Sequence, residues 1–600
     1  MVDLLRYLRD RQVLTQEQGR WTLRQAVPDL RRDLPESVRA MIQRKIDQLN
    51  EDDRRLLVAA SVQGYEFDSA VVARVLQRDA AEIEDRLDEL DRVHAFVRAV
   101  REQEFPDGTL TLRYRFVHVL YQNALYASLR PTRRASLSAT VAQALLGYYG
   151  EKSEEVAAEL ALLLEVARDF SRAADYFLAA ARNAARIFAN QEAIVLARRG
   201  VEMLASLPDT PERARKELSL QITLGTPLMA TMGFPATEVE RTYRRAHELC
   251  RQIGETPDLF PALYGLWLFH TTRAELRTAR NLGEQLLGLA QRAQDSALLL
   301  QAHHALGPTD VNAGDWASAQ MHLEQCISLY DPQEHRSHAF LYGGHDPCAC
   351  CLGFAAQSLW MLGYPDQALE KSRKSLALAR ELSHPYSLAW TRLQVGTLHQ
   401  FRRDSSETQE QAEALQGLSD EQGLPHHLAA GSILRGWALA ERGHGEEGLA
   451  QMRQGLAASS MSPLFWRVHF LALLAEVSGR AGKIEEGLDA LAEALRAVDD
   501  KGIGYYEPEL HRLKGELQLA RGPENSADAE ACFRQAIAIA RRQRARSLEL
   551  RAVMSLSRLY HGQGKQDEVR PMLAEIYGWF TEGFDTVDLR EAKALLQVAS

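Results

Sequence analysis

Apolar residues recur at three- and four-residue spacing along most of the chain, which is the period of amphipathic α-helices. Between about Gly307 and Ser557, turns interrupt these helical segments at nearly regular intervals. A glycine or another turn residue ends one segment, and in most units a small residue follows five positions later. These pairs are Gly314/Ala319, Gly363/Ala368, Arg403/Thr408, Gly443/Gly448, Gly482/Gly487, Gly522/Ala529 (two residues late) and Gly564/Val569. Their second members lie 39–42 residues apart, except for 49 between Ala319 and Ala368.

Other small residues stand seven positions before each turn and, in most units, seven positions after the second member. The first set is Gly307, Ala356, Gly396, Gly436, Ala475, Gly515 and Ser557, and the second is Cys326, Ser375, Gly455, Ala494 and Ala536. Seven residues are about two helical turns, so these side chains share one helix face and let a neighbouring helix approach closely. The pattern predicts stacked antiparallel helix pairs, an α-solenoid. It resembles the tetratricopeptide repeat, lengthened from the usual period of about 34 residues.

A small helical domain is predicted to precede the solenoid. Its expected helices are Glu36–Leu49, Asp52–Val62, Ser69–Leu76 and Ala80–Arg92. Phe96–Val100 and Leu110–Val117 alternate apolar and polar residues around a turn at Pro106-Asp107-Gly108, which predicts a β-hairpin. Helices followed by a hairpin indicate a winged helix. Because the helix over residues 80–92 is rich in acidic side chains, it would repel DNA phosphates. We interpret this domain as a packing module, with DNA binding as the minor alternative.

Composition narrows the class of protein. At 600 residues the chain is too long for one core, so several units are expected. A net charge of −10 and a pI near 6.0 argue against a general nucleic-acid or membrane-surface binder. No apolar run approaches the length of a membrane span. Six cysteines do not make a disulfide framework at this size, so we expect a cytoplasmic protein.

The N-terminal stretch differs from the rest. Met1–Asp10 predicts an amphipathic helix whose apolar stripe (Leu4, Leu5 and Leu8) has no evident partner nearby, and residues 12–23 predict a short extended pair. We therefore divide the chain as follows: 1–34, an arm; 35–150, the winged-helix-like domain; 151–300, irregular helical repeats; 301–600, regular repeats that end in a capping helix over 587–598.

Several segments resemble known bacterial proteins. Leu34–Ile42, Leu56–Gly64 and Arg115–His118 resemble the winged-helix region of signal-transduction ATPases of the STAND type. Three further segments resemble a narrower group of these proteins: His335–Gly343 with Asp346-Pro347, Leu362–Leu369 and Tyr577–Thr586. In that group a class III adenylate/guanylate cyclase domain precedes the ATPase and a tetratricopeptide tail. The resemblance covers essentially the whole chain but only the tail of that architecture. It implies that residues 1–34 are the C-terminal remnant of an ATPase arm.

The phosphate-binding motif of such ATPases is not found. A P-loop needs Gly-x-x-x-x-Gly-Lys-Ser/Thr, because its backbone N–H groups cradle phosphates and its hydroxyl binds Mg²⁺. Gly479–Ile484 and Gly562–Gln566 come nearest, but both lack the glycine spacing and the hydroxyl, and both fall in predicted turns between helices. We therefore expect no catalytic activity and no cofactor in this chain, and we expect it to be the downstream part of a longer protein.

Two functional hypotheses remain. The first is a non-catalytic protein-interaction and regulatory scaffold, the partner-sensing part of a STAND-type signalling ATPase. Its expected partners are a protein or peptide in the concave groove of the solenoid and an upstream or separately encoded ATPase or cyclase domain, with no nucleic acid and no membrane. The alternative is a part of an ATP-binding adenylate/guanylate cyclase, or of an ATP-dependent transcriptional regulator, that acts with the upstream domains.

One dense group of metal-ligand residues lies in the longer interval between Ala319 and Ala368. Its members are His335, His338, His345, Cys348, Cys350 and Cys351. Thiolates and imidazoles are zinc ligands, but structural zinc sites usually show two paired arms such as C-x-x-C, and this spacing does not. We favour buried thiols here and expect no metal.

The repeat geometry predicts a partner-binding groove. In tetratricopeptide arrays the first helix of each pair lines the concave side, at fixed offsets from the small residue. Those offsets select His304, Gln357, Trp360, Trp390, Gln400, Trp437, His469, Glu476, Arg512 and Glu516. Aromatic and arginine side chains there suit a peptide or helix partner. The alternative is that the tryptophans belong to the core.

Overall fold

The computed structural model describes residues 14–17, 20–23, 36–233, 236–254, 257–336, 338–459 and 463–598. The helix predicted over residues 1–10, with its stripe of Leu4, Leu5 and Leu8, lies outside them. The extended pair predicted over residues 12–23 is confirmed as strands β1 (Leu14–Glu17) and β2 (Arg20–Leu23), which pair antiparallel. The chain divides into two compact units. Unit 1 is Met1–Asn183 with Val195–Lys216, and unit 2 is Ala184–Ile194 with Glu217–Ser600.

Unit 1 begins with the predicted helices and hairpin. The elements are α3 (Glu36–Asp47), α4 (Glu51–Gln63), β3 (Glu66–Asp68), α5 (Ser69–Leu76), α6 (Ala80–Arg92), β4 (Val97–Glu104) and β5 (Leu110–Phe116). The strands form an antiparallel sheet in the order β3-β5-β4. The short strand β3 was not predicted, because three residues do not reveal a two-residue period. Its Phe67 is buried against Tyr114 and Phe116 at the centre of the core.

The following helices of unit 1 are α7 (Val119–Ala127), α8 (Pro131–Tyr149), the 3₁₀ helix η1 (Gly150–Val156) and α9 (Ala157–Ala167). Next come α10 (Phe170–Arg186), α11 (Asn190–Ala205) and α12 (Pro211–Met232), each of which has residues in both units. Helices α8 and α9 bury a second apolar cluster that includes Leu145, Leu160 and Phe177. The buried Tyr148 donates a hydrogen bond to the carbonyl of Ala70, so α8 is fixed to α5.

One carboxylate in unit 1 makes stability depend on pH. Burial, and then the nearby Asp68, raises the pKa of Glu159 from 4.5 to about 7, against the lowering effect of Arg113. The folded chain therefore keeps a proton that the unfolded chain loses between pH 4.5 and 7, and unit 1 loses stability as pH rises through this window. We expect Glu159→Gln to stabilise unit 1 at pH 8, on the order of 1–2 kcal/mol after solvent screening, and to have little effect at pH 4. Urea unfolding at the two pH values measures this.

The matched control is Glu154→Gln, which changes an exposed carboxylate in the preceding 3₁₀ helix. It should leave the urea midpoint unchanged at both pH values. An equal response of the two variants at pH 8 would contradict the assignment to Glu159.

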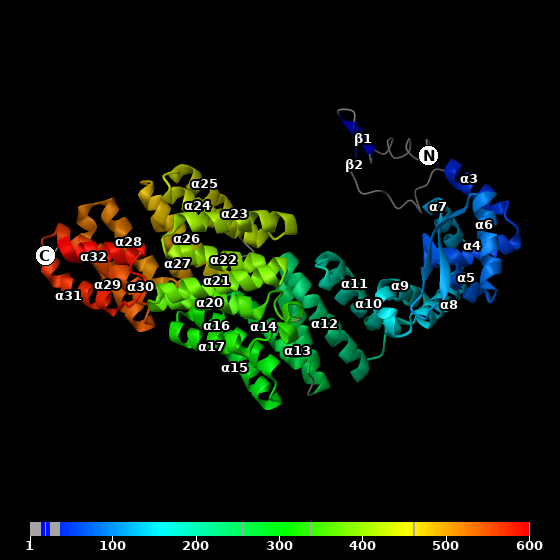
Figure 1. Cartoon of the computed structure of the whole chain (residues 1–600), viewed down its shortest axis with the longest axis horizontal. Helices are drawn as coiled ribbons and strands as arrows, with labels where there is room; N and C mark the ends of the chain where they lie inside the picture. The colour runs from blue at the N-terminus through cyan, green and yellow to red at the C-terminus, as the bar shows by residue number, and fades with distance from the viewer. Residues whose placement is uncertain are drawn as a thin grey trace. The chain divides into compact units, whose positions relative to one another are not determined.

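Unit 2 is a stack of antiparallel helix pairs (Figure 1). Before the regular repeats come α13 (Thr237–Ile253), α14 (Leu259–Thr272) and α15 (Leu276–Ala293). The repeats are α16 (Ser296–Ala313) with α17 (Trp316–Leu329), α20 (Pro347–Leu362) with α21 (Pro365–Glu381), α22 (Pro385–Phe401) with α23 (Ser405–Gln422), α24 (Pro425–Glu441) with α25 (Gly445–Ala458), α26 (Leu464–Arg480) with α27 (Ile484–Lys501), α28 (Glu507–Arg521) with α29 (Ser526–Gln543), and α30 (Arg546–Gly562) with α31 (Gln566–Trp579). Helix α32 (Val587–Val598) packs on the last pair, as predicted. The all-α solenoid fold is confirmed.

The turn residues behave as the pattern requires. Gly314, Gly363, Gly443, Gly482 and Gly564 all have a left-handed backbone, with φ between 71° and 95°. Glycine adopts this conformation without steric cost. Arg403 takes the same place with φ 58°, and the extended Gly522 is followed by a 3₁₀ helix, η3 (Pro523–Asn525), which explains the two-residue delay before Ala529.

Small residues mark helix crossings, also as predicted. A Cβ added to Gly436 would lie 2.6 Å from the carbonyl oxygen of Gly448, and one added to Gly448 would lie 2.3 Å from the carbonyl oxygen of Gly436. Helices α24 and α25 therefore meet backbone to backbone at this point. The longer interval before Ala368 holds two short helices, α18 (Pro332–His335) and α19 (His338–Leu341).

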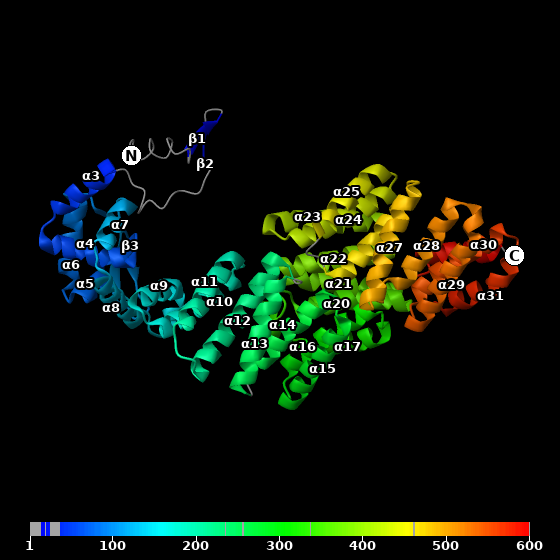
Figure 2. The same ribbon diagram turned by 180° about the vertical axis from the view of Figure 1, so that it is seen from behind.

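The first helices of the pairs contact one another in sequence, and this inner row closes on itself, because α20 also contacts α30 (Figure 2 gives the opposite view). The Tyr505 hydroxyl donates to Gln357 Oε1 at 2.8 Å, and the Gly504 N–H donates to the Asn312 carbonyl at 2.9 Å. Much of the inner surface is therefore filled by the chain itself. Among the described residues, no helix is both long and apolar enough to cross a lipid bilayer.

Candidate functional site

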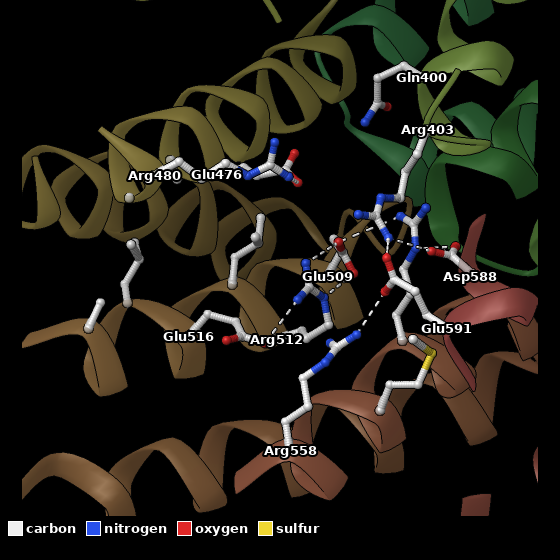
Figure 3. Close-up of a pocket in the computed structure, with 17 residues that line it drawn as sticks. Gln400, Arg403, Glu476, Arg480, Glu509, Arg512, Glu516, Arg558, Asp588 and Glu591 are labelled. Atoms are coloured by element: carbon white, nitrogen blue, oxygen red, sulfur yellow. Dashed lines mark hydrogen bonds and ion pairs between the residues drawn. The ribbon is translucent and has the colours of Figure 1, made fainter. Parts of the chain in front are cut away.

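A charged pocket of about 430 Å³ lies on the inner side of the last repeats of unit 2. Its arginines are Arg403, Arg480, Arg512, Arg551 and Arg558, and its carboxylates are Glu476, Glu509, Glu516, Asp588 and Glu591. Figure 3 shows side chains from α26, α28, α30 and α32 directed toward this common space. The apolar part of the lining includes Leu513, Leu517 and Met554. The pocket thus combines opposite charges with an apolar surface.

Ion pairs hold the pocket walls in place. Arg512 pairs with Glu509 through two nitrogen atoms at 2.8 and 2.9 Å. Arg551 donates to Asp588 at 2.7 Å, which fixes α32 to α30. Arg403 pairs with Glu591 at 2.9 Å and Asp588 at 3.3 Å. The Arg551 and Arg403 contacts link α30, α32 and the turn after α22, whereas the Arg512–Glu509 pair lies within α28.

Two other arginines are more accessible. The side chain of Arg558 is 46% exposed and reaches Glu591 at 2.8 Å. That of Arg480 is 45% exposed and pairs with Glu441 and Glu476. A ligand can therefore reach both guanidinium groups from solvent, whereas Arg512 and Arg551 belong to the walls.

The five arginines and five carboxylates of the pocket shift one another's pKa values in different directions. Burial, with the positive charges of Arg403 and Arg512, lowers the pKa of Arg480 to about 10. Burial also raises the pKa of Glu476, against the opposing effect of Arg512, so this carboxylate is less readily ionised. Burial alone would raise the pKa of Glu509, but Arg512 and Arg551 lower it overall.

The structure brings four predicted groove residues together in the charged pocket: Gln400, Glu476, Arg512 and Glu516. His469 is buried behind them, with its Nε2 3.0 Å from Gln400 Oε1. The indole of Trp437 is also buried and donates to Glu476 Oε2 at 3.1 Å.

The remaining groove residues lie elsewhere in the interior of unit 2. Gln357 is buried and accepts from Tyr505, and Trp360 stacks on Phe401 with Arg551 over its face. Trp390 and His304 lie in a cluster of histidines and cysteines near α18 and α19. The residues chosen from the repeat geometry therefore lie on the inward-facing side of the first helix of each pair. Most of their side chains are buried, because the first helices pack against one another.

The sequence analysis did not identify most of the pocket residues, including seven of its ten charged side chains. Arg551 and Arg558 are seven residues apart on α30 and so share its inner face, the same spacing that relates Glu509 to Glu516 on α28. Charges repeated at this interval were a usable signal. Asp588 and Glu591 gave none, because they reach the pocket only when α32 packs on α30.

The predicted group of metal-ligand residues separates in the structure. His338 Nδ1 lies 2.9 Å from the side-chain nitrogen of Gln301, and Cys351 contacts Cys326. His345 and Cys350 instead meet His304 of α16, and the ligand atoms of these three residues all lie within 4.8 Å of one another. Burial lowers the pKa of both His304 and His345, so both imidazoles are neutral at physiological pH.

The two P-loop-like stretches lie where predicted. Gly479 and Arg480 end α26, and Gly482 turns the chain before α27 begins at Ile484. Gly562 ends α30, and α31 begins at Gln566. Each stretch connects the two helices of one repeat, α26 to α27 and α30 to α31.

Comparison with known proteins gives distant likenesses. No protein-family profile matches the chain. An uncharacterized protein of Rhizobium meliloti is 26% identical over 456 residues, which cover 74% of this chain and 43% of that protein. The chain thus spans less than half the length of this curated relative.

Among solved structures, a Rap protein complexed with Competence and Sporulation Factor has 12% identity and a TM-score of 0.42, with 66% of this chain and 99% of that one covered. A signal transduction ATPase with numerous domains and a tetratricopeptide repeat sensor, from Pyrococcus horikoshii, has 10% identity and a TM-score of 0.30, with 82% and 64% covered.

Proposed function

We propose that this chain is a non-catalytic protein-interaction scaffold whose charged pocket receives an acidic segment of a protein partner. The observation that carries the proposal is the pair of accessible guanidinium groups, Arg480 and Arg558, above an apolar lining. Arginine binds carboxylates through paired hydrogen bonds, and the neighbouring leucines suit an apolar side chain of the same segment. Because the walls carry both charges, the pocket should prefer a peptide segment that places its charges to match over a simple anion.

The regulatory part of the proposal rests on the resemblance described above. We place the chain as the partner-sensing segment that acts with an upstream or separately encoded ATPase or cyclase domain. In this arrangement residues 35–150 are a winged-helix packing module between that domain and the repeats. A part of an ATP-binding cyclase or of an ATP-dependent transcriptional regulator, acting with the upstream domains, is the alternative to this proposal.

The test uses the full chain and short fluorescent peptides of equal length, one set acidic and one basic, each with two leucines. We expect the acidic set to bind, more weakly as salt increases, because the contact is between charges. The double variant Arg480→Ala/Arg558→Ala should weaken binding about tenfold or more, since a hydrogen bond to a charged group contributes about 1.5–3 kcal/mol. Fluorescence anisotropy measures both effects.

Arg521→Ala is the matched control, because Arg521 is an equally exposed arginine of α28 that pairs with Glu485 and does not line the pocket. It should bind acidic peptides like the unmodified chain. If the double variant retains full affinity, or if basic peptides bind as well as acidic ones, the proposal is wrong.

A further inference from the structure

We propose that His304, His345 and Cys350 bind a thiophilic metal ion, with Zn²⁺ as the expected occupant. This inference is independent of the charged pocket and of the scaffold function. It rests on three buried side chains, His345 and Cys350 five residues apart and His304 on α16, whose ligand atoms all lie within 4.8 Å of one another. Two imidazoles and one thiol are a donor set that zinc takes in proteins.

The spacing of the two imidazoles matches a coordination shell. His304 Nε2 and His345 Nε2 are 3.4 Å apart. This distance is long for a strong N–H···N hydrogen bond. It equals the edge of a tetrahedron with metal–nitrogen bonds of about 2.0–2.1 Å, which is about 3.4 Å. The sulfur of Cys350 lies within 4.8 Å of a ring nitrogen of each histidine, and it supplies a third bond of about 2.3 Å if its side chain moves toward the ion.

Hydrogen bonds behind the imidazoles turn both Nε2 lone pairs toward this point. His345 Nδ1 lies 3.1 Å from the Gly343 carbonyl, which can only accept, so Nδ1 carries the proton. Gln301 directs its side-chain nitrogen to His338 and its oxygen to His304 Nδ1, at 3.3 Å. In this arrangement His304 holds its proton on Nδ1, and both Gln301 Oε1 and the Tyr264 hydroxyl oxygen, 2.8 Å away, accept from it. Two lone pairs then face each other in a dry interior, and a cation between them resolves the repulsion.

The surroundings hold the ligands in position. Trp390 stacks on the ring of His345 with the centroids 5.2 Å apart and the planes at 12°. The Tyr264 hydroxyl lies 2.8 Å from His304 Nδ1. Restricted rotamers and bonded outer atoms are the features that preorganise metal ligands. Since His304 lies on α16, His345 follows α19 and Cys350 lies in the first turn of α20, a bound ion would fasten the α18–α19 insertion to the helices on both sides.

The experiment titrates the chelator-treated full chain with ZnCl₂ and, separately, with CoCl₂. Calorimetry should show one tightly bound Zn²⁺ per chain, and thermal unfolding of unit 2 should shift upward with zinc. Cobalt should give the intense visible bands of a tetrahedral site with thiolate ligation. Cys350→Ser and His345→Gln should each lower zinc affinity about a hundredfold or more, and Tyr264→Phe about ten- to a hundredfold.

Cys348→Ser is the control, because Cys348 is a buried thiol of the same helix turn outside the ligand set. It should keep one equivalent of zinc and the cobalt spectrum. Far-UV circular dichroism of each variant confirms that the helices remain. A parallel titration with Cu⁺ under anaerobic conditions distinguishes the two thiophilic ions, and tight one-to-one binding of either at this site supports the proposal.

Two results would overturn it. In the first, the unmodified chain binds neither Zn²⁺ nor Cu⁺ at micromolar concentration, and a proton on His304 then occupies the gap. In the second, the double variant His345→Gln/Cys350→Ser binds zinc as tightly as the unmodified chain, which would assign the metal to other residues.

Discussion

Replacing Arg551 by alanine should destabilise unit 2 by about 3–5 kcal/mol, the cost of breaking a buried ion pair on one side. Arg551 is 8% exposed and donates to Asp588 and to the Phe401 carbonyl, and its guanidinium lies 4.8 Å from the centre of the Trp360 ring. Without it, the Phe401 carbonyl loses its donor, and Asp588 and Glu509 lose a nearby positive charge. Urea unfolding followed by circular dichroism measures the change.

Arg558→Ala provides the comparison on the same helix face. Its side chain is about half exposed and pairs with Glu591, so its removal should cost less than about 1 kcal/mol. Hydrogen exchange adds a local measurement, because the Arg551 variant should lose protection in α30 and α32 first. Equal destabilisation by the two substitutions would show that Arg551 does not hold the inner row closed.

Trp437→Ala should also cost about 3–5 kcal/mol, because it removes one of the largest fully buried side chains and leaves a cavity. The sequence left open whether this residue faces a groove or the core, and its 1% exposure places it in the interior. Trp437→Phe separates packing from the hydrogen bond to Glu476, and should cost about 1–3 kcal/mol. The shift of the urea midpoint gives both values.

Met321→Ala is the control for this second prediction. Met321 is a large apolar side chain of α17 that is 54% exposed, so its truncation should change stability by less than about 0.5 kcal/mol. An unchanged urea midpoint for Trp437→Ala would argue that the tryptophan is available to a partner rather than required by the fold.

Because the inner row of helices closes on itself, most of the predicted binding groove is not open to a partner. An open solenoid presents its concave side to a partner along its whole length. Here Tyr505 fills the space beside Gln357, and Gly504 joins the backbone at Asn312. The charged pocket near the last repeats is an accessible part of the inner side, where Arg480 and Arg558 remain exposed.

The sequence by itself determined the repeat architecture, because its causes are local. A left-handed turn needs a residue such as Gly443, and a close helix crossing needs small residues such as Gly436 and Gly448. Both requirements recur at a fixed period and can be recognised without knowing what lies across the molecule. The amphipathic helices α5 and α6 were predicted to the residue for the same reason.

Only the tertiary structure decided which inward-facing residues meet. Asp588 joins Arg551 and Arg403 across 37 and 185 positions of sequence, and His304 meets His345 across 41. Whether residues so far apart in sequence come close in space depends on the sum of small rotations between successive helix pairs. No local pattern in the chain encodes that sum. The same closure determined that Gln357 is buried while Arg558 remains open to solvent.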